Sequence, residues 1–468
     1  MSETAELAVV GAGPAGLAAA ALAAGFGLDV ALIDEQPGPG GQIYRGIETS
    51  PHAPGTVLGE DYWYGARPVR AFRRSRVRYL PSTAAWSLDR ERELGLLHAG
   101  QARTLAAKRV ILATGAIERP IPIPGWSLPG VMTAGGAQIL LKTAGMVPHS
   151  GTVLAGSGPL LWLLAWQIGR AGGKLDAILD TTPKSNWRRA WPHLPAFAVS
   201  PYALKGLRLR LAVGRRFRVV SGVVALAAEG QERIEAVRWQ GADGSEGRLA
   251  VDTLLLHQGV VPETNLAMAA GVPHRWEETR LCFEPVLDAY GDTEVPGIAI
   301  AGDGGGILGA WAAEETGRLA AVAAIRALRP DAAEALRPVE ARARRALAHV
   351  ERGRAFLDAL FRPAERFRIP EGETLACRCE EIAAGRVIEA ASMATGPNQL
   401  KAYLRCGMGP CQGRMCGLTV TELMAKARGV SPAAVGHYRI RPPVKPLTVA
   451  ELAGLPPDPV GEGAVNRD

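Results

Sequence analysis

Short apolar runs separated by glycine-rich turns recur along most of the chain. Residues 7–10 (LAVV) have the continuous apolar character of a buried parallel strand, and the alanine- and leucine-rich residues 14–25 have that of a helix. Further runs predict strands at 29–33, 110–115, 151–155, 175–180 and 297–304. Strands that alternate with helices in this way predict an α/β fold with parallel sheets.

The first strand leads directly into a glycine motif, GAGPAG, at residues 11–16. We expect Gly11 to allow a tight turn and Gly13 to let the backbone approach a pyrophosphate. Gly16 would let the helix pack closely on the strand, and the N-terminus of that helix offers free N–H groups to an anion. The residues expected around the pyrophosphate are Gly11, Gly13, Pro14, Ala15 and Gly16.

An acidic residue ends the next predicted strand, as a dinucleotide site requires. Asp34 follows Gly16 by eighteen residues and is placed to accept hydrogen bonds from ribose hydroxyls, and Glu35 beside it is a further expected cofactor-binding residue. The alternative is a glycine-rich turn that binds no ligand. The strand, helix and acid in the expected order favour a nucleotide site.

A second motif, GSGPLL at residues 156–161, follows the predicted strand 151–155. Gly156 and Gly158 match the dinucleotide pattern, but Leu161 stands where the third glycine belongs and is expected to push the helix away from the strand. Asp180 ends the next strand and could bind a ribose. Two interpretations remain open: a site for NAD or another adenine nucleotide such as ATP, and a degenerate domain kept for packing.

Five of the six cysteines fall within forty residues, between Cys377 and Cys416. Such clustering indicates a local metal centre in a reducing compartment, not a disulfide scaffold. A CxC pair and glycine-rich turns without histidine fit a [2Fe–2S] cluster better than zinc. Cys282 stands alone and is expected to be a core residue, which excludes a redox-active cysteine pair beside the first site. His257 is expected to be a core histidine, with a place near the cofactor as the alternative.

Composition narrows the class of protein. A length of 468 residues suggests about three domains, and 47% apolar with 21% charged residues indicates a globular chain. The net charge of +7 is mild and predicts no nucleic-acid partner. The N-terminus leaves no room for a signal peptide, and no apolar run approaches the ~20 residues that span a bilayer. We therefore expect a cytoplasmic protein without direct membrane insertion.

The first part of the chain resembles the two-dinucleotide-binding-domain flavoproteins, which include thioredoxin and glutathione reductases. The resemblance rests on GAGPAG, on GGQIYR at 40–45, on VILATG at 110–115 and on GIAIAGDG at 297–304, in the family's order. It implies FAD as the cofactor, with Asp303 at the ribityl chain. The helix from about Ala310 would direct its N-terminus to the flavin. The further cofactor residues implied are Gly41, Gln42, Arg45, Thr114, Gly115 and Gly302.

The cysteine segment resembles the bacterioferritin-associated-ferredoxin-like domain, which has a CxC pair, about thirty residues and a second pair. By that resemblance the cluster ligands are Cys377, Cys379, Cys411 and Cys416, and Cys406 is spare. The last pair is Cx4C instead of CxxC, as in the related domain of anaerobic glycerol-3-phosphate dehydrogenase. The exchange of Cys406 for Cys416 therefore stays open.

Nearly the whole chain resembles the large α subunits of heteromeric FAD/[2Fe–2S] amino-acid dehydrogenases. This family includes octopine and nopaline oxidases, D-hydroxyproline and proline dehydrogenases, hydrogen cyanide synthase and heterotetrameric sarcosine oxidase. The resemblance rests on residues 113–138, 406–417 and 441–447 (RPPVKPL). It implies a D-amino-acid-oxidase-like β subunit with its own FAD, which oxidises a C–N bond. Also implied are an FMN at the subunit interface and a small ferredoxin-like γ subunit.

In this interpretation the chain passes electrons through FAD and a [2Fe–2S] cluster to an acceptor, and it contains no catalytic residue of its own. Two other classes remain: a self-sufficient NAD(P)H-dependent reductase and a nucleotide-binding scaffold. The expected domains are an FAD domain at 1–148 and 281–328, a second nucleotide domain at 149–280, a helical linker at 329–370, a [2Fe–2S] domain at 371–430 and a tail at 431–468.

Overall fold

The computed structural model describes residues 3–455, so the end of the expected tail, from residue 456, lies outside the described residues. Its first sheet has seven strands in the order β3-β2-β1-β6-β5-β4, with β19 also paired to β6. The strands β3, β2, β1, β6 and β19 pair in parallel, whereas β6, β5 and β4 form an antiparallel meander. The strands are β1 Glu3–Val10, β2 Val30–Ile33, β3 Arg78–Leu80, β4 Thr83–Leu88, β5 Glu93–His98, β6 Gln101–Leu112 and β19 Ile298–Ile300.

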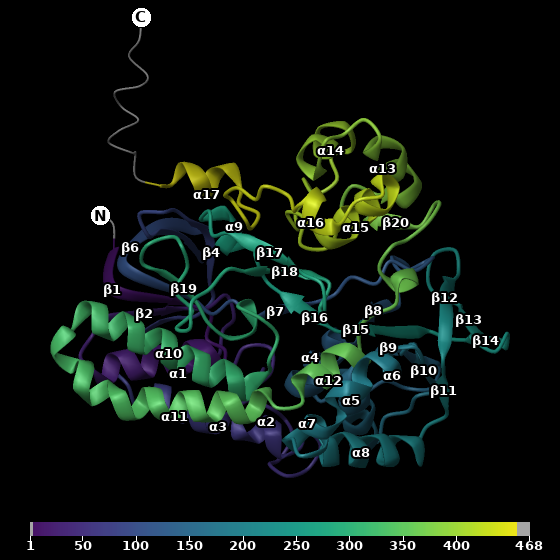
Figure 1. The fold of residues 1–468 in the computed structure, drawn as a ribbon, viewed down its shortest axis with the longest axis horizontal. Coiled ribbons are helices and arrows are strands. Elements are labelled where there is room, and N and C mark those ends of the chain that lie inside the picture. The colour runs from purple at the N-terminus through teal and green to yellow at the C-terminus, as the bar shows by residue number, and fades with distance from the viewer. Residues whose placement is uncertain (1–2, 456–468) are drawn as a thin grey trace, which may run out of the picture.

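Helices cover one side of this sheet (Figure 1). Helix α1 (Pro14–Gly25) packs along α10 (Ala310–Leu328), which in turn packs on α11 (Ala333–Glu351). The contact between α1 and α10 is close because Gly317 has no side chain: a Cβ there would lie 2.2 Å from the carbonyl oxygen of Ala15. The short helices α2 (Glu60–Tyr64) and α3 (Ala66–Arg73) complete this layer.

A second, five-stranded parallel sheet has the order β11-β10-β9-β15-β8. Its strands are β8 Val131–Thr133, β9 Thr152–Ser157, β10 Ala177–Asp180, β11 Val219–Ser221 and β15 Thr253–Gln258. Helices α4 (Ala134–Ala144), α5 (Pro159–Arg170) and α8 (Pro201–Gly214) belong to this part of the chain, and α6 (Asn186–Ala190) and α7 (Leu194–Ala198) lie between α5 and α8 in sequence. The antiparallel strands β12 Val223–Glu229, β13 Ala236–Gly241 and β14 Glu246–Ala250 form a separate three-stranded sheet.

Two short antiparallel pairs of strands lie between the first and second sheets along the chain. Strand β7 (Ala116–Glu118) pairs with β16 (Val260–Pro262), and β17 (His274–Glu277) pairs with β18 (Cys282–Pro285). The short helix α9 (Asn265–Ala269) follows β16. Helices α11 and α12 (Arg354–Leu360) then lead to the C-terminal part of the chain.

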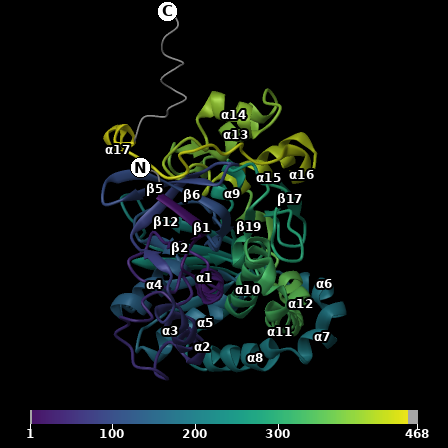
Figure 2. The ribbon, with the colours of Figure 1, turned by 90° about the vertical axis from the view of Figure 1, so that its left-hand side faces the viewer.

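The C-terminal module is small and mostly helical. It contains β20 Leu375–Cys377, β21 Ile382–Ala383, α13 Ala384–Ala391, α14 Pro397–Leu404, α15 Gly417–Arg428 and α16 Pro432–Val435, and the short helix α17 (Val449–Ala453) follows it. A single buried cluster joins residues of the first sheet to this module. The two views show the module at one end of the molecule and α8 at the opposite end (Figures 1 and 2).

The predicted α/β fold is confirmed, and the helix predicted at 14–25 has these bounds. The strands predicted at 29–33 and 175–180 begin later, at Val30 and Ala177. The run at 297–304 forms a strand only over Ile298–Ile300, because Gly302 adopts a positive φ and starts a 3-10 turn. Within residues 3–455 no helix is both long and apolar enough to cross a bilayer.

Candidate functional site

The first glycine motif forms a turn that only glycine can make. Gly11 has φ of +106°, and a Cβ there would lie 2.3 Å from the carbonyl oxygen of Ala113. A Cβ on Gly16 would lie 1.8 Å from the carbonyl oxygen of Gly11. Among the described residues, no side chain caps the N-terminus of α1, and its first turn contains no acid. The free N–H groups of this turn can therefore receive a phosphate.

The two carboxylates after β2 have different surroundings. Asp34 is buried, and its carboxylate accepts hydrogen bonds from the backbone N–H groups of Ala12 and Gln36, the latter at 2.7 Å. Burial raises the pKa of Asp34, and these two hydrogen bonds oppose the rise. Asp34 thus ties the glycine turn to β2. Glu35 forms an ion pair with Lys445, and because its side chain is 47% exposed it is the more accessible of the two carboxylates.

The loop at residues 40–45 lies against the glycine turn. A Cβ on Gly41 would lie 2.8 Å from the Cα atom of Gly13, so the two backbones are in contact. The guanidinium of Arg45 donates to the Oε1 atom of Gln42 at 3.1 Å. The loop therefore lies beside the turn that is expected to bind the pyrophosphate.

The same loop is contacted by Lys142, a residue that sequence reasoning missed. Its Nζ atom donates to the backbone oxygen of Gln42 at 3.1 Å and to Oε1 of Gln138 at 2.9 Å. Lys142 is buried, and among the described residues it has no carboxylate partner within 4 Å. Burial, assisted by the charge of Arg45, lowers its pKa to about 7. A lysine inside an amphipathic helix carries no signal of such burial in the sequence.

The Gly-Asp turn after β19 meets the strand end at Thr114 and Gly115. A Cβ on Gly304 would lie 3.4 Å from Oγ1 of Thr114 and 3.5 Å from the oxygen of Gly115. One carboxylate oxygen of Asp303 accepts from the N–H groups of Leu308 at 3.0 Å and Gly309 at 2.9 Å. The next helix, α10, begins at Ala310 as predicted, and no described side chain caps it. The turn therefore presents a second free helix N-terminus to the site.

His257 packs directly against the second glycine motif. A Cβ on Gly156 would lie 1.7 Å from the oxygen of His257, and a Cβ on Gly158 would lie 3.2 Å from its Nε2 atom. The Nδ1 atom of His257 lies 2.7 Å from Oε1 of Glu118, and the histidine is buried. His257 is thus a partnered core residue, as predicted. Leu161 is fully buried in the apolar cluster under this sheet.

The acid at the end of β10 already has protein partners. Asp180 is buried, accepts from the N–H of Thr182 at 3.0 Å and lies 3.8 Å from an amino group of Arg210. Its role is therefore comparable to that of Asp34, which also accepts from a backbone N–H two residues further on.

Three buried cysteines meet in the C-terminal module. The sulfur atoms of Cys377, Cys406 and Cys416 all lie within 4.8 Å of one another. The thiols of Cys406 and Cys416, with backbone N–H groups of Gly407 and Glu380, hold the pKa of Cys377 far below the usual thiol value. A cysteine group that favours a thiolate has the chemistry that metal ions and iron–sulfur clusters require.

The other two cysteines lie at the edge of the same group. Cys379 is exposed and interacts with both the thiol and the backbone N–H of Cys411. A Cβ on Gly409 would lie 2.3 Å from the Cβ of Cys379, which places the CxC segment against the glycine-rich loop. The CxC segment and the glycine-rich loop are therefore in contact. Cys406, which the resemblance leaves spare, lies beside Cys377 and Cys416.

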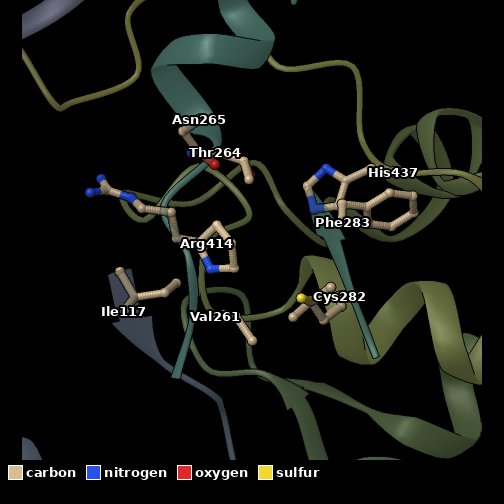
Figure 3. A pocket seen from close by; sticks show the side chains of 10 residues that line it. Ile117, Val261, Thr264, Asn265, Cys282, Phe283, Arg414 and His437 are labelled. Carbon is tan, nitrogen blue, oxygen red and sulfur yellow. The ribbon is translucent and has the colours of Figure 1, made fainter. Parts of the chain in front are cut away.

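The sixth cysteine lies elsewhere, beside a small cavity between the first part of the chain and the C-terminal module (Figure 3). The cavity has a volume of about 20 Å³, enough for one water, and is lined by Cys282, Phe283, Arg414 and His437 among others. Burial raises the pKa of Cys282 to about 12, so it stays a thiol. The side-chain amide of Asn265 donates to the backbone oxygen of Gln412 at 3.0 Å, which anchors the cysteine loop on this contact.

Comparisons with known proteins agree with this geometry. The family described as pyridine nucleotide-disulphide oxidoreductase matches residues 5–184, and the family described as sarcosine oxidase A3 domain matches residues 393–455. The opine oxidase A subunit of Rhizobium meliloti is 49% identical over 462 residues, which cover 96% of this chain and 87% of that protein. The HcnB subunit of hydrogen cyanide synthase from Pseudomonas protegens is 30% identical over 461 residues, covering 94% of this chain and 95% of that protein. The crystal structure of L-proline dehydrogenase from P. horikoshii shares the fold, with a TM-score of 0.67, 20% identity and coverage of 97% of this chain and 80% of that chain.

The parallel strands of the two sheets, the uncapped glycine turn and the Gly-Asp turn define an oxidoreductase of the α/β flavoprotein class with two dinucleotide-binding domains. The first site is that of FAD or a similar flavin. Within this class, the chain belongs to the family of opine oxidase A subunits.

Proposed function

We propose that this chain is the electron-transfer subunit of a heteromeric flavin-dependent dehydrogenase that oxidises a C–N bond of an amino acid, imino acid or opine. The partner β subunit, with its own FAD, oxidises the substrate. This chain holds a second FAD and a [2Fe–2S] cluster and passes the electrons to an acceptor. The observation that carries the proposal is the meeting of three buried cysteines, Cys377, Cys406 and Cys416, in a module packed on a flavoprotein fold.

The residues of the first site have separate tasks in this function. The N–H groups at the start of α1 bind the pyrophosphate, Glu35 accepts from the ribose, and Asp303 holds the turn that faces the ribityl chain. A bound flavin accepts electrons in pairs and can release them singly, which suits a one-electron carrier such as an iron–sulfur cluster. The N-terminus of α10 would favour negative charge beside it.

We propose Cys377, Cys379, Cys411 and Cys416 as the cluster ligands, and the position of Cys406 makes it the residue to test. Each cysteine is replaced by serine in turn, and iron and sulfide are quantified in the purified protein. We expect loss of iron in the four ligand variants and retention in C406S, with C282S as the control for a buried thiol. Loss of iron in C406S but not in C416S would exchange these two residues.

The heteromeric arrangement is supported by the names of the relatives, which are subunits. A small ferredoxin-like γ subunit, an FMN at the subunit interface and an adenine nucleotide at the second glycine motif belong to the same proposal. The purified chain alone is expected to show negligible amine oxidation with an artificial acceptor, and co-expression with a D-amino-acid-oxidase-like subunit should restore it. Robust turnover by the isolated chain would contradict the proposal. Rapid bleaching of the flavin by NADH would instead favour an NAD(P)H-dependent reductase.

A further inference from the structure

One helical layer, at the end of the molecule opposite the cysteine module, buries almost none of its side chains. The 3-10 turn Trp191–His193 and helix α7 contain no buried residue in the described structure, and α8 contains only Val213. Figures 1 and 2 both place α8 along the outer edge of the molecule. A helix of fourteen residues that buries one side chain gains little stability from its own domain.

The outward side of this layer is apolar. Leu204, Leu207 and Leu211 have exposed fractions of 56%, 56% and 51%, and their spacing of three and four residues places them on one side of α8. Trp191 and Val199, in the preceding turns, are 67% and 72% exposed. Large apolar side chains that gather in this way mark an interaction surface.

The charged side chains of the layer are all positive. Residues 187–211 contain four arginines and one lysine and no aspartate or glutamate. Lys205 pairs with Asp61 and Arg210 lies 3.8 Å from Asp180, whereas the other three cations have no ion-pair partner within 4 Å among the described residues. A second copy of this chain would therefore repel the layer, and an acidic partner would complement it.

The composition favours a protein over a lipid surface. Arginine and tryptophan are enriched in protein interfaces and lysine is depleted, as in this layer. The leucine ridge of α8 is narrow, since Arg208 and Arg210 flank it, and a narrow ridge fits a groove of another protein better than it fits a bilayer.

The layer also borders the flavin site. The start of α8 packs against the residue before Arg354, because a Cβ on Gly353 would lie 2.7 Å from Oγ of Ser200, the N-cap of α8. Arg354 donates to the backbone oxygen of Ile307, within the segment that leads to α10. A protein bound on α7 and α8 would lie next to the flavin of this chain.

We infer that the layer formed by residues 187–211 is the docking surface for the β subunit, which meets it with an apolar groove rimmed by acidic side chains. The inference rests on the proposed function, because it assumes a β subunit. Docking here brings the two flavin-containing subunits together beside the Gly-Asp turn. Electrons can then pass between the subunits over a short distance.

The test is co-purification of the full-length chain with the co-expressed β subunit, followed by measurement of the dissociation constant. L207E and R208E should each weaken the complex at least about tenfold. The matched control V449E changes a residue that is 85% exposed on α17, far from the layer, and should bind like the wild type. Flavin content and thermal unfolding should be unchanged in all three variants. Affinity should fall with added NaCl.

Unchanged binding of L207E and R208E would overturn the docking surface and leave the proposed function intact. Failure of the wild-type chain to bind any β subunit would overturn the proposed function as well. Sedimentation with vesicles of phosphatidylcholine and phosphatidylglycerol tests the lipid alternative. Vesicle binding that L207E abolishes, with the complex intact, would assign the layer to a membrane surface instead.

Discussion

The Nζ atom of Lys445 lies 2.5 Å from Oε2 of Glu35, although 410 positions separate the two residues. The segment around Lys445 is held further by the N–H of Val444, which donates to the backbone oxygen of Trp86 at 2.8 Å. Arg414, between the last two cysteines, donates to the backbone oxygen of Val444 at 3.2 Å. The C-terminal segment thus links the cysteine loop to the carboxylate proposed for the ribose.

Replacing Lys445 by methionine tests how much this ion pair contributes. Burial alone would raise the pKa of Glu35, and the ammonium of Lys445 lowers it below the usual value. We expect K445M to raise the pKa of Glu35 and to reduce the free energy of unfolding by less than about 1 kcal/mol, because both side chains are partly exposed. Urea denaturation at neutral pH measures the change. A loss well above about 2 kcal/mol would show that the segment depends on this contact.

Substitution of Gly16 should abolish the first cofactor site. In G16A the new Cβ would collide with the carbonyl oxygen of Gly11, so α1 must move away from β1. We expect the purified variant to lose most of its flavin, as measured by its visible absorbance relative to protein. The matched control is G25A at the end of the same helix, where no atom lies within 4 Å of the added Cβ. G25A should keep its flavin and gain up to about 1 kcal/mol.

Lys142 should make stability depend on pH. Its pKa in the folded chain, about 7, is lower than in the unfolded chain, about 10.4. Between these values the unfolded chain binds more protons, so stability should rise with pH, by up to about 2.5 kcal/mol from pH 7 to pH 9. K142M should remove this rise, and K174M, at an exposed lysine, should keep it. Denaturation at both pH values in excess FAD distinguishes the variants. Equal slopes for wild type and K142M would show that Lys142 stays charged.

Local patterns in the chain predicted the parts of the molecule that depend on contiguous residues. GAGPAG determines the turn before α1, because Gly11 and Gly16 each avoid a clash with nearby backbone. The order of apolar runs likewise predicted an α/β fold with parallel strands. The sequence could not predict that the carboxylate of Asp34 accepts hydrogen bonds from the N–H groups of Ala12 and Gln36, whereas Glu35 stays accessible. This difference depends on how β2 meets the turn.

The sequence could not predict the contacts of Lys142, Lys445 and Cys406 either, because these contacts join segments that are distant along the chain. The family resemblance leaves Cys406 outside the ligand set, but folding of the loop brings its sulfur within 4.8 Å of Cys377 and Cys416. By itself, the sequence determined the fold class, the flavin motif and the presence of a cysteine centre, because these are encoded by short-range spacing and apolar periodicity. Only the tertiary structure decided which charges are buried, which cysteines meet and which helical face stays uncovered, because packing between distant segments controls both solvation and proximity.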